Sequence, residues 1–278
     1  MNMIKVASPR RRQVARFANQ SYTTHPICSS CPKDQMNRHC LETLEHRRLL
    51  STITLSDNRL TIVGNQNSPN RIVVGYSPGT RYIVCVVNGV PTDFKRDDVG
   101  GVYIFGGNDN DYLAISQARA PFDKGVRIMG GAGNDTLIGG DSNDIIYGDS
   151  GNDYISLGSG DDIAVAGGGN DRILGGSATK TIFGGSGNDV IEMGDSHGYI
   201  FSNQGNDSIL DSSGAQFEIL GGGGNDTITS LGDDTIWGGG GHDVIHGGKE
   251  VHSGTISGIN QIMKELMPIE PTLPAGST

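Results

Sequence analysis

A nine-residue repeat constrains the fold of this chain more than any other feature of its sequence. The repeat runs from residue 130 to residue 246, with its clearest copies at residues 130–138 (GGAGNDTLI), 184–192 (GGSGNDVIE) and 221–229 (GGGGNDTIT). Each copy has a glycine-rich half, suited to tight turns and positive φ angles, followed by a short apolar half. A fixed short period of this kind predicts stacked units in which each repeat contacts its neighbours.

The eighth position of each unit holds an aliphatic residue, which we expect to point inward from a three-residue strand. Two units make one coil, so equivalent positions recur every 18 residues and the turns stack on two opposite edges. Only Ala164 in this series is small. The spacing of nine changes twice, by one added residue near Asp211 and one missing near Leu231. The series predicts one continuous core formed by Leu137, Ile146, Ile155, Ala164, Ile173, Ile182, Ile191, Ile200, Ile209, Ile219, Ile228, Ile236 and Ile245.

The sixth position differs between the two edges. One edge carries an aspartate in every coil, namely Asp135, Asp153, Asp171, Asp189, Asp207, Asp226 and Asp243. The opposite edge reads Asp144, Asp162, Lys180, Gly198, Phe217 and Asp234. Both edges must turn, so a residue needed only for turning would persist on both. The complete aspartate row therefore indicates a binding role, and the interrupted edge is expected to be available for packing or for a partner.

Stacked carboxylates favour bound cations. Neighbouring strands lie about 4.8 Å apart, and two unit charges at that distance repel by roughly 3–4 kcal/mol at an effective dielectric of 20. Aspartate oxygens and turn carbonyls in a flexible geometry suit Ca²⁺ better than Mg²⁺. We predict about six calcium ions along the complete row and one more between Asp144 and Asp162. The alternative is that the aspartates only form turns.

These repeats are similar to the repeats-in-toxin (RTX), or hemolysin-type, family of calcium-binding nonapeptides. The resemblance spans Gly106 to His246 and includes an imperfect first copy at residues 106–114. It implies an all-β fold, a parallel β-roll or β-helix solenoid that binds Ca²⁺. Such repeats occur in secreted cytolysins, in C-terminal domains of serralysin-like proteases and in mannuronan epimerase modules, so the resemblance also implies an extracellular or cell-surface location.

The whole chain is expected to have four parts. Residues 1–51 are expected to be a disordered leader, and residues 52–105 a short antiparallel β segment, because β-branched runs at 52–56, 59–63, 71–75 and 82–87 are separated by turn residues. The β-roll is expected over residues 106–255. In residues 256–278, the apolar residues Ile259, Ile262, Met263 and Leu266 have helical spacing up to Pro268, which predicts a C-terminal capping helix and a loose tail.

The leader contains a segment that resembles the Leu-Glu-x-Arg-x-Leu-Leu-Ser stretch of many secreted and surface proteins of planctomycete-type bacteria. The matching residues are Leu44, Glu45, Arg47, Leu49, Leu50 and Ser51. The resemblance implies sorting to the cell exterior, and an incidental short helix is the alternative. Leader residues Cys28, Cys31, His39 and Cys40 lack the complete ligand spacing of a zinc site.

The charge and the motifs of the chain argue against several classes of function. The chain has a net charge of −10, but the leader carries nine basic and three acidic residues, so residues 52–278 carry about −16. An acidic body repels phosphates, which argues against nucleic acid and favours cations. The sequence contains no apolar run long enough to span a membrane. The two histidines of His242-Asp-Val-Ile-His246 lie on a repeat strand, about 13 Å apart, which does not suit a zinc-protease site.

The expected function is therefore a secreted or surface calcium-binding β-solenoid whose folding is coupled to Ca²⁺, and not an enzyme. One alternative is an adhesive or structural surface protein that binds cell-surface polysaccharide or protein partners. A second is a non-catalytic module related to epimerases, lyases or proteases, because residues 52–105 are too short for a catalytic domain and lack a paired acid and base.

Overall fold

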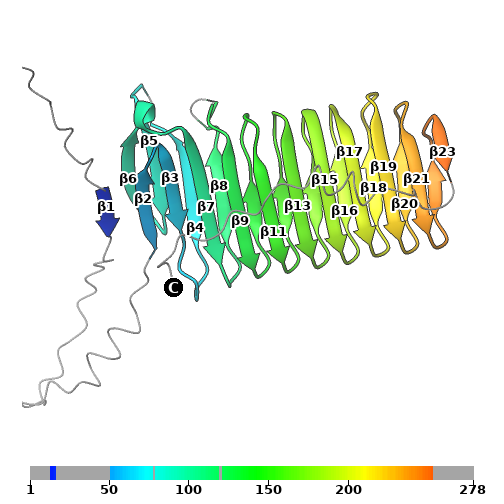
Figure 1. Cartoon of the computed structure of the whole chain (residues 1–278), viewed down its shortest axis with the longest axis horizontal. Helices are drawn as coiled ribbons and strands as arrows, with labels where there is room; N and C mark the ends of the chain where they lie inside the picture. The colour runs from blue at the N-terminus through cyan, green and yellow to red at the C-terminus, as the bar shows by residue number, and fades with distance from the viewer. Residues whose placement is uncertain (1–12, 17–50, 78, 119–120, 253–278) are drawn as a thin grey trace, which may run out of the picture.

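The computed structural model describes residues 13–16, 51–77, 79–118 and 121–252. Its strands stack along one axis as a solenoid, with successive coils side by side (Figure 1). The predicted all-β solenoid is confirmed, with about seven coils over residues 127–252 and antiparallel strands before them. Within the described part of the chain, no helix is long and apolar enough to cross a membrane.

Two sheets line the solenoid. Sheet A has the order β1-β2-β3-β7-β9-β11-β13-β15-β17-β19-β21-β23. Its strands are β1 (Gln13–Arg16), β2 (Thr52–Ser56), β3 (Arg59–Val63), β7 (Gly101–Gly107), β9 (Val126–Ala132), β11 (Ile145–Ser150), β13 (Asp162–Gly168), β15 (Ala178–Ser186), β17 (Ser196–Gln204), β19 (Phe217–Gly223), β21 (Thr235–Gly240) and β23 (Glu250–His252).

Sheet B faces sheet A and has the order β22-β20-β18-β16-β14-β12-β10-β8-β4-β5-β6. Its strands are β4 (Arg71–Tyr76), β5 (Tyr82–Val87), β6 (Val90–Lys95), β8 (Tyr112–Ser116), β10 (Thr136–Ile138), β12 (Tyr154–Ser156), β14 (Arg172–Leu174), β16 (Val190–Met193), β18 (Ser208–Asp211), β20 (Thr227–Ser230) and β22 (Val244–His246). We name the turns that lead from sheet A to sheet B edge 1, and those from sheet B to sheet A edge 2. The complete aspartate row lies on edge 1.

The predicted inward series forms the core between the two sheets. Twelve of its thirteen residues, from Leu137 to Ile236, are at most 1% exposed, and Ile245 in the last coil is partly buried against them. Paired residues such as Ile155 and Ile173 are 18 apart in adjacent strands. The 18-residue coil is therefore confirmed. The eighth-position residue points inward because successive side chains of a strand alternate between its two faces.

The segment at residues 52–105 is part of the two solenoid sheets and does not form a sheet of its own. The pairs β2–β3, β4–β5 and β5–β6 are antiparallel as expected, but β3 also pairs in parallel with β7, and β4 with β8. Each of the two solenoid sheets thus continues into this segment, because β3 and β4 bury their own aliphatic residues against the same core. The strand pairing is continuous across the predicted boundary at residues 105 and 106.

Little of the leader and none of the C-terminal tail falls within the described residues. Residues Gln13–Arg16 form strand β1, which pairs antiparallel with β2 inside a segment expected to lack structure. The leader cysteines, residues 44–50 of the sorting-like segment and the helix expected within 256–278 lie outside the described residues.

Candidate metal centre

The edge 1 aspartates point into their turns instead of toward solvent. From Asp135 to Asp226 their exposure is 1–2%, and Asp243 in the last coil is half-buried. The row starts one coil earlier than predicted, at Asp111, which is 3% exposed. Each carboxylate folds back over the first residue of its own repeat, so a Cβ added to Gly130 would lie 2.2 Å from Asp135 Oδ2. This close approach explains the first-position glycine, although Ala166 and Ser202 hold that place in two coils.

One oxygen of each aspartate links neighbouring coils. The backbone N–H of Asp135 donates to Asp153 Oδ1 at 2.7 Å, and the same bond recurs in every coil of the row. The ladder begins at the Asn70 N–H and ends at Asp243 Oδ1, with distances of 2.6–3.0 Å; its acceptors are Asp111, Asp135, Asp153, Asp171, Asp189, Asp207, Asp226 and Asp243. Oδ1 therefore has a structural role that satisfies a buried amide.

The other oxygen of these aspartates has no hydrogen-bond partner. Buried polar atoms in folded proteins are nearly always hydrogen-bonded, yet Oδ2 is buried and unpartnered in Asp111, Asp135, Asp153, Asp171, Asp189, Asp207 and Asp226. A row of orphaned carboxylate oxygens fits a hard cation. Across the described residues, no three His, Cys, Asp or Glu side chains gather at one point. A calcium ion at Oδ2 would therefore take its remaining protein ligands mainly from turn carbonyls.

Burial also raises the pKa values of the aspartates in this row. It raises the pKa of Asp135 and Asp153 to about 7, because removal from water disfavours the charged form. The same cause raises the pKa of Asp171, Asp189, Asp207 and Asp226 to about 6. For Asp153 the backbone hydrogen bond opposes this rise, whereas the neighbouring carboxylates Asp135 and Asp171 add to it. A bound cation would reverse the effect by favouring the charged form.

A second ladder on edge 1 had no role in the sequence prediction. The asparagine before each aspartate accepts, at Oδ1, the N–H of the equivalent residue one coil later, as between Asn170 and Asn188 at 2.7 Å. This ladder runs in the opposite direction to the aspartate ladder and lies at the surface; its acceptors are Asn110, Asn134, Asn152, Asn170, Asn188, Asn206 and Asn225. The recurring Gly-Asn-Asp sequence is the signal from which it could have been predicted.

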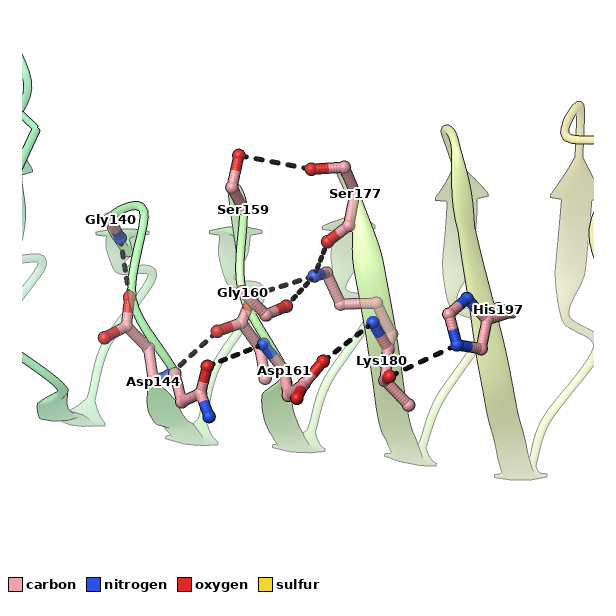
Figure 2. Close-up of polar contacts among 11 residues, drawn as sticks. Gly140, Asp144, Ser159, Gly160, Asp161, Ser177, Lys180 and His197 are labelled. Atoms are coloured by element: carbon pink, nitrogen blue, oxygen red, sulfur yellow. Dashed lines mark hydrogen bonds and ion pairs between the residues drawn. The ribbon is translucent and has the colours of Figure 1, made fainter.

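Edge 2 uses its two predicted aspartates differently. Asp144 Oδ2 accepts the Gly140 N–H at 2.6 Å (Figure 2). Its Oδ1 accepts the Val126 N–H at 2.8 Å. Asp162 Oδ1 accepts the Asp144 N–H at 2.8 Å, and its Oδ2 lies 3.0 Å from Lys180 Nζ. Burial raises the pKa of Asp144 to about 6 and of Asp162 to about 7. Each Oδ2 already faces a nitrogen, and the calcium ion predicted between these residues stays a prediction.

Two of the three residues that interrupt the aspartates of edge 2 pack inside their own turns. Lys180 is 0% exposed and Phe217 is 2% exposed, so both side chains fill the inside of their turns, and Gly198 is half-buried. Further along this edge, Asp211 lies beside Asp234, and both are buried. Burial and the neighbouring Asp234 raise the pKa of Asp211. Asp211 stands outside the sixth position, so the repeat pattern did not identify it.

A β-solenoid with two turns per coil and a buried aspartate row along one edge belongs to the β-roll class of calcium-binding repeat proteins. The family profile of the RTX calcium-binding nonapeptide repeat matches four times, at residues 127–155, 156–191, 181–209 and 220–250. The chain thus contains RTX calcium-binding repeats over residues 127–209 and 220–250, as the sequence predicted, and Ca²⁺ is the ion of these repeats. A search of curated proteins found no match.

Proposed function

We propose that this protein is a secreted or surface-displayed solenoid whose folding is coupled to calcium bound along edge 1. The observation that supports this most is the row of buried, unpartnered Oδ2 atoms from Asp111 to Asp226. The ions would lie against these oxygens, and Asp243 would extend the row into the last coil. An RTX solenoid is a structural domain that usually has no catalytic activity, and the proposal assigns the chain no reaction.

The coupling follows from the two roles of each aspartate. Oδ1 must accept a backbone N–H to join the coils, which places Oδ2 inside the turn. At neutral pH the carboxylate must then either hold a proton or carry an unpaired buried charge, and both reduce stability relative to a solvated aspartate. A cation at Oδ2 removes this penalty. Because the unfolded chain has no preformed site, the free energy of metal binding stabilises the fold.

The proposed location follows from the family and from calcium availability. RTX proteins are typically secreted or surface-exposed. Extracellular calcium modules work with dissociation constants of roughly 10⁻⁴–10⁻³ M, so a site in this range would be empty in a calcium-poor cytosol and filled outside. The solenoid would then form after export.

Far-UV circular dichroism of the full chain tests the coupling. A metal-stripped sample at neutral pH is expected to lack most of the β signal and to gain it when millimolar calcium is added. The same concentration of magnesium serves as the control, because Mg²⁺ requires near-ideal octahedral geometry and is reluctant to lose water. An equally folded metal-free protein would refute the coupling.

A further inference from the structure

Lys180 occupies the sixth position of its repeat, where edge 1 carries aspartate in every coil. Its side chain is 0% exposed, and so is that of Asp162 in the preceding coil. Lysine is almost never fully buried unless it is paired. A buried lysine at a position that elsewhere supplies an anion reverses the sign of charge inside the turn.

The Lys180 ammonium has an oxygen partner for each of its three protons. Nζ donates to the Gly160 carbonyl at 2.5 Å and to the Ser177 carbonyl, and lies 3.0 Å from Asp162 Oδ2 (Figure 2). One carboxylate and two turn carbonyls are the ligand types that calcium takes from proteins. Gly160 and Asp162 belong to one turn and Ser177 to the next, so the ammonium joins two successive coils as a metal ion between them would.

We propose that the Lys180 ammonium is a tethered cation that takes the place of a calcium ion between these two coils of edge 2. Calcium then binds along edge 1 but not at Asp162, and this part of edge 2 needs no metal to close. The proposal rests on the proposed function only for the calcium ions of edge 1. The contacts of Lys180 are independent of them.

The next turn of edge 2 is consistent with closure without metal. Its sixth position is Gly198, and the Met193 side chain reaches under the preceding turn, where a Cβ added to Gly175 would lie 2.5 Å from Met193 Cε. In the following coil Phe217 fills the turn. Ammonium, thioether and phenyl groups thus occupy the space that carboxylates line on edge 1.

Counting bound calcium in variants of the full chain tests the replacement. Lys180→Asp restores the edge 1 pattern and is expected to bind one more ion per chain than the wild type, as measured by isothermal titration calorimetry and native mass spectrometry. Lys249→Asp makes the same charge change at an exposed lysine paired with Asp233, and is expected to leave the count unchanged. A folded Lys180→Asp protein with the wild-type count would overturn the proposal.

A measurement on the wild type avoids the risk that a variant fails to fold. Amine acetylation, read residue by residue by mass spectrometry, is expected to spare Lys180 and to modify Lys249 at saturating calcium. If calcium displaces the ammonium, Lys180 will become reactive as calcium rises, and the proposal is wrong. A folded chain that binds no calcium yet protects Lys180 would refute the proposed function and leave the ammonium link supported.

Discussion

The backbone N–H of Asp153 donates to Asp171 Oδ1 at 2.7 Å, across 18 residues of sequence and one coil of the solenoid. The bond uses one oxygen of Asp171 for structure and leaves the other, Oδ2, buried and unpartnered. Each aspartate can therefore have a structural role through Oδ1 and the proposed metal-binding role through Oδ2. Substitutions that keep one oxygen and remove the other can separate them.

Replacing Asp171 by asparagine or by alanine should give different results. Asp171→Asn keeps a carbonyl oxygen for the Asp153 N–H but lacks the carboxylate charge, so we expect at least one bound calcium to be lost with the coil contact retained. Asp171→Ala also leaves that buried N–H unsatisfied, at a cost of about 1–3 kcal/mol. Calorimetric calcium counts and urea unfolding in metal-free buffer at pH 5 measure the two effects. Equal metal-free stabilities of the two variants would contradict the separate role of Oδ1.

The two edges should differ in calcium stoichiometry. Asp234 on edge 2 also accepts a buried N–H, from Phe217 at 2.7 Å, and its Oδ2 is likewise buried without a hydrogen-bond partner. It differs from Asp171 in its position, because it lies beside Asp211 and outside the edge 1 row, so Asp234→Ala is the control for Asp171→Ala. We expect Asp171→Ala to lower the number of bound calcium ions more than Asp234→Ala does. Equal losses, measured by equilibrium dialysis on folded protein, would show that calcium binding is not concentrated on edge 1.

The metal-free fold should be more stable in mild acid than at neutral or alkaline pH. Aspartates in an unfolded chain have a pKa of about 3.9, whereas burial raises the pKa of Asp153 to about 7 and of Asp189 to about 6. The folded chain therefore binds more protons between these values, and its free energy of unfolding falls as the pH rises from 4 toward 7. Far-UV circular dichroism of the metal-stripped protein at pH 5 and pH 8 measures this, and we expect more β signal at pH 5.

Saturating calcium should remove that dependence, because the ion competes with protons for the same carboxylates. Unfolding at both pH values with calcium present is the control. A metal-free protein that gains stability from pH 5 to pH 8 would contradict the burial of the aspartate row.

The fourth position of the edge 1 repeats, from Gly133 to Gly241, should tolerate only glycine. Gly187 has a φ of +122°, and a Cβ added there would lie 1.9 Å from the Gly169 carbonyl oxygen of the preceding coil. Gly187→Ala is expected to cost about 1–3 kcal/mol in calcium-saturated protein through backbone strain alone, and the close contact adds to this. Gly214→Ala, with no atom within 4 Å of its added Cβ, is the control and should change stability by less than about 0.5 kcal/mol. Similar unfolding midpoints would show that the turns rearrange freely.

The repeat pattern predicted the core and the edges because both depend on period alone. An aliphatic residue every nine positions defines the inward face, and the added and missing residues reappear as intervals of 19 between Asp207 and Asp226 and of 17 between Asp226 and Asp243. Asp111 was predictable by the same pattern, since it follows Gly106 as Asp135 follows Gly130.

The nine-residue spacing could not predict other features of the site. Spacing does not tell which carboxylate oxygen meets an N–H, so the separate roles of Oδ1 and Oδ2 appear only in the structure. A lysine in a turn is ordinarily solvated, and nothing in the sequence near Lys180 indicates that two carbonyls and Asp162 surround it. The first coil was hidden because residues 64–70 lack the glycine-aspartate pattern, although Asn70 Oδ1 accepts the Asn65 N–H there.

A crystal structure grown with calcium would show whether Oδ2 of the edge 1 aspartates binds calcium. We expect ions in contact with Oδ2 atoms and turn carbonyls along the row from Asp111 to Asp243, and the Lys180 ammonium in place of an ion beside Asp162. Edge 1 turns that hold only water at Oδ2 while calcium binds elsewhere, or not at all, would contradict it.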